Sequence, residues 1–108
     1  MALEMSSELL RNWKVIRVKG QVDSKTSAEL RTYLEEEVTG SNPVALELSA
    51  VPFMSSAGLR TLLTLYRQTQ SLGVPLALVG LPTALVDTMK ITGFLQHFTV
   101  YTDLNELS

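Results

Sequence analysis

Two adjacent serines, Ser55 and Ser56, are the residues best placed to do chemistry, since they lie where a short apolar segment passes into a long amphipathic one. The start of a helix presents free backbone N–H groups and partial positive charge, which suit an anion such as a phosphoryl group. Arg60 lies in the predicted first turn, where it opposes the helix dipole but favours a phosphate on either serine. The pattern predicts a phosphorylation switch whose main effect falls on a bound partner.

Gly58 occupies the same predicted turn, where a glycine lowers the stability of the helix by about 1 kcal/mol relative to alanine. This cost indicates that something approaches the backbone closely at Gly58. The alternative is that the serines only cap the helix. A cap alone explains neither the second serine nor the glycine.

The remaining chemically capable side chains are isolated. With no cysteine and one histidine, His97, the chain has no thiolate couple and no Cys or His zinc cluster. Ser56 lacks the Gly-x-Ser-x-Gly pattern of a hydrolase nucleophile because Met54 takes the first glycine position, and no phosphate-binding loop is present. We therefore predict a protein that is not an enzyme and holds no metal or cofactor. A small hydrolase with His97 as its base is the weakest alternative.

Length and charge further restrict the class of protein to which the chain can belong. The 108 residues suit one domain, and nine Lys and Arg against eleven Asp and Glu leave no basic excess for nucleic acid. The longest apolar stretches, such as residues 74–80, fall far short of the roughly 20 residues that span a bilayer. No targeting segment is visible, and the lack of cysteine fits a reducing compartment, so we predict a cytoplasmic protein with no membrane partner.

The elements that must position the serines alternate along the chain. Apolar and polar residues alternate at 13–19, after a weaker candidate strand at 3–10, and predict a hairpin. A helix is predicted at 25–38, with Asp23 or Ser24 as its cap, and a core strand at 44–48.

The second half of the chain continues the alternation. A helix is predicted at 57–72, a strand at 74–79, a helix from 83 to 92, a strand at 98–101 and a short helical turn at 103–107. The order predicts a single α/β domain over residues 1–108. Its mixed, mostly parallel sheet has about five strands with an N-terminal antiparallel hairpin and three to four helices.

Several segments resemble the STAS domain of bacterial anti-sigma factor antagonists, also called anti-anti-sigma factors. Residues 20–23, Gly-Gln-Val-Asp, are similar to that family's Gly-x-Leu-Asp, and residues 46–49 to its central strand. Residues 91–94 resemble its Ser-Gly-Leu or Thr-Gly-Leu segment. The resemblance covers nearly the whole chain and implies the STAS fold.

Residues 53–59 resemble the family's signature, which usually reads Phe, Ile or Met, Asp, Ser, Ser, Gly, Leu. The positions that match it are Met54, Ser56, Gly58 and Leu59. Ser55 stands at the aspartate position, and Ala57 replaces the second serine. The resemblance implies that Ser56 is the phosphorylated residue, with Ser55 as the alternative acceptor.

In that family the domain binds an anti-sigma factor that is itself an ATP-dependent serine kinase, which phosphorylates the signature serine and so releases the antagonist. A serine phosphatase of the PP2C type resets the switch. The resemblance thus implies an antagonist that frees a sigma factor when unphosphorylated. The implied partner-binding residues are Asp23, Met54, Ser55, Ser56, Ala57, Gly58, Leu59 and Arg60.

A second interpretation stays open beside this one. The chain can be a constitutive STAS scaffold or regulatory domain without a phosphorylation switch, binding a small anionic or lipid ligand at the same helix end. The sequence does not identify the anti-sigma factor, the sigma factor or the phosphatase, because surface detail decides partner choice. It also leaves open whether the chain is a monomer or a weak dimer.

Overall fold

A computed structural model describes residues 3–107 and consists of one five-stranded sheet with helices packed on it. The strands follow chain order across the sheet, with β1 antiparallel to β2 and the other neighbours parallel. The predicted fold class is confirmed. The strands are β1 (Glu4–Leu10), β2 (Trp13–Lys19), β3 (Val44–Ala50), β4 (Leu76–Val79) and β5 (Thr99–Tyr101), and the helices are α1 (Thr26–Glu37), α2 (Ser56–Leu72) and α3 (Thr83–Thr92).

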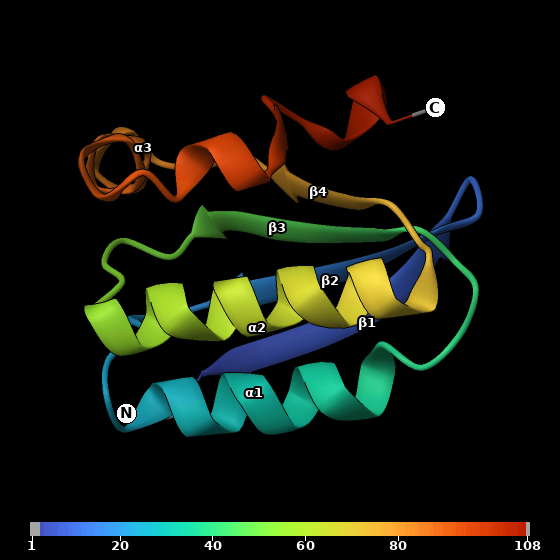
Figure 1. The fold of residues 1–108 in the computed structure, drawn as a ribbon, viewed down its shortest axis with the longest axis horizontal. Helices are drawn as coiled ribbons and strands as arrows, with labels where there is room; N and C mark the ends of the chain where they lie inside the picture. The colour runs from blue at the N-terminus through green and yellow to red at the C-terminus, as the bar shows by residue number, and fades with distance from the viewer. Residues whose placement is uncertain (1–2, 108) are drawn as a thin grey trace.

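All three helices contribute to the core on one face of the sheet. Figure 1 shows α1 and α2 side by side along the strands, with α3 seen end-on beyond the end of β4. Inward residues of the helices, such as Leu30, Leu62 and Met89, pack in one cluster with Ile16 and Leu46 of the central strands. This arrangement follows from parallel strands joined by crossovers of one hand. It also places the starts of α1 and α2 at the same end of the sheet.

The opposite face carries a smaller core that the C-terminal segment covers. Trp13, Val15 and Ala45 lie there beneath Leu107, which is 2% exposed. Arg11 ties this segment down, since its guanidinium donates to the carbonyl oxygens of Leu104 at 2.8 Å and Leu107 at 3.2 Å. The β1–β2 turn thereby holds the end of the described chain over the sheet.

The short turn predicted at 103–107 is a 3-10 helix at Leu104–Glu106. Asp103 accepts a hydrogen bond from the backbone N–H of Asn105, and Glu106 accepts one from Asp103 N–H, which completes a capping box. A second 3-10 helix at Leu95–His97 was not predicted, because three residues carry no periodicity.

Several predicted boundaries move by a few residues. The fourth strand begins at Leu76 rather than residue 74, because Pro75 has no N–H to donate. The last strand begins at Thr99 rather than Phe98, and α1 begins at Thr26. The third strand runs to Ala50 instead of ending at residue 48. Within residues 3–107, no helix is long and apolar enough to cross a membrane.

Replacing Leu107 by alanine is expected to destabilise the fold by about 2 kcal/mol, since it opens a cavity in the smaller core. Trp13 is the only tryptophan and packs in the same cluster, so its emission should shift to the red. Chemical denaturation followed by fluorescence measures both effects. Leu9→Ala is the matched control, because Leu9 is 66% exposed. Equal stability of the two variants would show that the C-terminal cover is not part of the cooperative fold.

Candidate functional site

The site lies where the segments that follow β2 and β3 are joined to each other. Val22 and Met54 form an isolated parallel bridge beyond the two strands. Val22 N–H donates to the Phe53 carbonyl at 3.0 Å, and Ser55 N–H donates to the Val22 carbonyl at 2.8 Å. These bonds bring the start of α1 beside the start of α2. The predicted site residues around Asp23 and Ser56 are therefore neighbours in space, although 33 residues separate them (56 − 23).

Gly58 packs directly on this bridge. A Cβ atom at Gly58 would lie 2.5 Å from Met54 Cγ and 2.8 Å from Val22 Cγ1, which is closer than carbon atoms can approach. The glycine therefore lets the first turn of α2 rest on the bridge. The family resemblance implies that Gly58 allows a kinase or partner to approach, whereas the neighbours that require a glycine here are internal. Nothing in one sequence distinguishes the two, because both need a missing side chain.

The two serines have different environments. Ser55 is the N-cap of α2, with extended backbone, and its Oγ accepts from Gly58 N–H at 3.5 Å, the long limit for such a bond. Ser56 is the first residue of the helix and is exposed. Among residues 3–107, the Ser56 side chain has no hydrogen-bond partner. Its hydroxyl is therefore the more accessible acceptor for a phosphoryl group.

Asp23 holds the start of α1. Its Oδ1 atom accepts from the N–H groups of Lys25 and Thr26, both at 2.9 Å, and from the Thr26 hydroxyl at 3.2 Å. The hydrogen bond from Thr26 N–H, then that from Lys25 N–H, lowers the pKa of this carboxyl below its ordinary value. Of the two predicted caps, Asp23 and Ser24, Asp23 accepts hydrogen bonds from the N–H groups at the start of α1, although the N-cap position itself is Lys25, whose side chain makes no capping hydrogen bond. Its carboxylate is thus ionised and fixed beside the bridge.

The predicted partner-binding residues divide by burial. Met54, Gly58 and Leu59 are buried and face the core, so they position the site and offer almost no side-chain surface. Asp23, Ser55 and Ala57 are half-buried, and Ser56 and Arg60 are exposed.

Phe53, which the predicted set omitted, is 49% exposed just before the serines. Phe53 therefore adds exposed aromatic surface beside the exposed and half-buried members of the predicted set. Its place directly before the serine pair was the only signal in the sequence.

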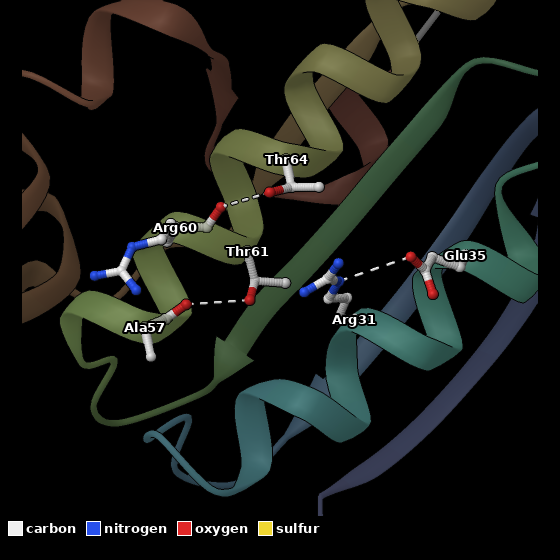
Figure 2. Close-up of polar contacts among 6 residues, drawn as sticks. All are labelled: Arg31, Glu35, Ala57, Arg60, Thr61 and Thr64. Atoms are coloured by element: carbon white, nitrogen blue, oxygen red, sulfur yellow. Dashed lines mark hydrogen bonds and ion pairs between the residues drawn. The ribbon is translucent and has the colours of Figure 1, made fainter.

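A groove between α1 and α2 adjoins the serines (Figure 2). The open groove has a volume of about 480 Å³, and Ser27 and Thr61 are the buried residues among those that line it. Thr61 and Thr64 turn their hydroxyls onto their own helix, donating to the carbonyls of Ala57 at 3.1 Å and Arg60 at 3.0 Å. Arg31 Nε lies 3.7 Å from Glu35 Oε2, one turn later on α1, so this ion pair runs along one wall of the groove. The hydroxyls of Thr61 and Thr64 are therefore engaged within α2, whereas the groove is also lined by Thr32 and by the charged side chains of Arg31, Glu35 and Arg60.

His97 lies far from the serines. Its ring centroid is 5.4 Å from that of Tyr66, and Tyr66 follows Ser56 by ten residues, which is roughly 15 Å along a helix. A base that activates a serine must lie within hydrogen-bond reach of it. The hydrolase alternative therefore lacks the contact it needs. Within residues 3–107, no three His, Cys, Asp or Glu residues gather to hold a metal ion.

Comparison with known proteins adds to this geometry. Residues 5–107 match the protein family described as the STAS domain. The chain is 27% identical over 99 residues to BtrV of Bordetella bronchiseptica, a protein named as an anti-sigma factor antagonist, covering 91% of this chain and 85% of that protein. An anti-sigma factor antagonist from Mycobacterium paratuberculosis superposes with a TM-score of 0.86 at 26% identity, covering 96% of this chain and 89% of the other. The phosphorylated form of the Bacillus protein SpoIIAA has the same fold, with a TM-score of 0.67 at 18% identity over 94% of this chain and 95% of the other.

Gly58→Ala is expected to destabilise the protein by about 1 to 2 kcal/mol, because overpacking against Met54 and Val22 outweighs the gain of about 1 kcal/mol in helix propensity. Thermal or urea unfolding measures the change. Gly40→Ala is the matched control, since the nearest atom to its added Cβ lies 3.9 Å away. If Gly58→Ala is as stable as the control, the contact with the bridge is not the reason for the glycine.

Asp23→Asn is expected to destabilise the protein near neutral pH, because the N–H groups of Lys25 and Thr26 lose a charged acceptor. Asparagine keeps an acceptor oxygen, so the substitution tests the charge alone. The pKa of Asp23 is lowered by folding from its ordinary value of 3.8, so its contribution is present above that value and is lost as the pH falls through the lower folded-state pKa. The melting temperatures of the two proteins should therefore differ at pH 7 and converge as the pH falls through the folded-state pKa of Asp23. A difference that stays constant down to acid pH would contradict the role of the charge.

Proposed function

The chain belongs to the STAS domain family, and on that premise we propose that it is an anti-sigma factor antagonist controlled by serine phosphorylation. In its unphosphorylated form it binds an anti-sigma factor that is also a serine kinase, and so frees a sigma factor. Phosphorylation of Ser56 by that kinase releases the antagonist, and a PP2C-type phosphatase restores it. Anti-sigma factor antagonists of this family are regulators without enzymatic activity. We place the exchange in the cytoplasm.

The observation that carries the proposal is the exposed Ser56 hydroxyl at the start of α2, without a side-chain partner in residues 3–107. A kinase must reach a hydroxyl and align it with the phosphate of ATP, and an exposed first helical residue allows that approach. Ser55 is less suited, since it is half-buried and its Oγ faces Gly58 N–H. The named relatives BtrV and the mycobacterial antagonist support the same assignment of function.

The phosphate would act on the partner more than on this fold. Ser56 is exposed, and the backbone N–H groups at a helix start already favour negative charge, so the domain can accept the group without rearrangement. A partner seated over Phe53 and Ser56 would instead meet about two added negative charges in its interface. Desolvating those charges weakens binding unless the partner supplies cations for them.

Phosphosite mass spectrometry on the protein from its own cell, with affinity capture of what binds it, tests the proposal. We expect phosphate on Ser56 and a kinase-like anti-sigma factor among the captured proteins. Phosphate on Ser55 alone would move the acceptor by one residue. Neither phosphate nor kinase would favour the constitutive scaffold.

Substitutions at Ser56 then test the direction of the switch against the captured partner. Ser56→Asp is expected to weaken binding by about tenfold or more, because it places a charge in the interface. Ser56→Ala should bind as the unmodified protein does and resist the kinase. Ser71→Asp adds the same charge at an exposed position in the last turn of α2, so it is the matched control and should bind normally. Equal affinities of the two Ser56 variants would contradict the mechanism.

A further inference from the structure

Arg60 is an exposed cation whose side chain has no hydrogen-bond or ion-pair partner among residues 3–107. The chain has five arginines, and three of them are engaged with carbonyl or carboxylate oxygens: Arg11, Arg17 and Arg31. The remaining two, Arg60 and Arg67, both lie on α2, which contains no acidic residue. Nothing on its own helix therefore neutralises Arg60.

Arg60 follows Ser56 by four residues on the same helix. Side chains at this spacing lie on one face, with Cβ atoms about 5 to 6 Å apart, and the later one leans toward the helix start. Figure 2 shows the Arg60 guanidinium running back toward the first turn of α2 and away from Arg31. The guanidinium thus lies on the side of Arg60 that faces the start of α2.

Ser55 does not share this relation. It precedes the helix with extended backbone and lies five residues before Arg60, off the spacing that places side chains on one face. Its Oγ is turned to Gly58 N–H. A phosphate on Ser55 would therefore leave the helix on a different side from the guanidinium.

We infer that Arg60 binds a phosphate on Ser56 and does not bind one on Ser55. The guanidinium can donate two parallel hydrogen bonds to phosphate oxygens, a geometry that lysine does not supply. The inference rests on the proposed function only for its choice of Ser56 as the acceptor. It adds a second effect to phosphorylation, because the pairing removes a free cation from the exposed surface while the phosphate adds negative charge.

Phosphoserine incorporated genetically at position 56 tests the contact without any kinase. Phosphorus NMR measures the second pKa of the phosphate, which is about 6 for free phosphoserine. We expect this pKa to lie about 0.15 to 0.4 lower in the unsubstituted chain than in Arg60→Ala, since a nearby guanidinium favours the dianion. The difference should shrink in 1 M salt, which screens exposed charges.

Two controls make the result decisive. Arg67→Ala removes the other unpaired cation of α2 and should leave the phosphate pKa unchanged, as should Arg60→Ala in a chain with phosphoserine at position 55. The inference is overturned if Arg60→Ala has no effect with phosphoserine 56, or if Arg67→Ala or the Ser55 form shows an equal shift. Because phosphoserine is incorporated during synthesis and no kinase is involved, this failure leaves open whether a kinase uses Ser56 in the cell, which the phosphosite experiment decides separately.

Discussion

The short bridge between Val22 and Met54 is the contact on which the rest of the site depends. It joins two loops that would otherwise leave the sheet independently, and it uses the backbone of both. Gly58 then sets the first turn of α2 directly on the bridge, while Asp23, one residue beyond it, holds the start of α1. Exposed residues such as Ser56 are therefore held by buried ones. A small displacement of the bridge would move both helix starts at once.

Much of the fold was predictable because its signals are local. Alternation at residues 13–19 and helical spacing at 57–72 each depend on neighbours a few positions apart, and both elements formed where the pattern placed them. The position of the serine pair at a helix start was also predictable, because a short apolar segment gives way there to helical spacing. The order of elements then restricted the topology, since parallel strands need crossovers.

The parts that were not predictable depend on contacts between distant residues. The neighbours of Gly58 include Val22, 36 residues earlier (58 − 22). No periodicity in the sequence indicates a contact between residues so far apart. The inward orientation of Met54 and Leu59 has the same origin, because only the packed core decides which side of a loop is buried. Residue types indicated that this segment was functional. The division between residues that support the site and residues that face a partner required the structure.

The serine at position 55 sets the electrostatics of this particular site. The family signature usually places an aspartate there, and a carboxylate one residue before a phosphorylated serine repels the phosphate by roughly 1 kcal/mol per pair of unit charges 4 Å apart in water. A carboxylate would also cap the helix more strongly than the 3.5 Å bond from Gly58 N–H to Ser55 Oγ. In this chain the cap of α2 is therefore weaker than an aspartate would make it, but the residue before Ser56 carries no negative charge. With no acid on α2, the first turn is the more favourable place for a dianion, and Arg60 has no competing partner within that helix.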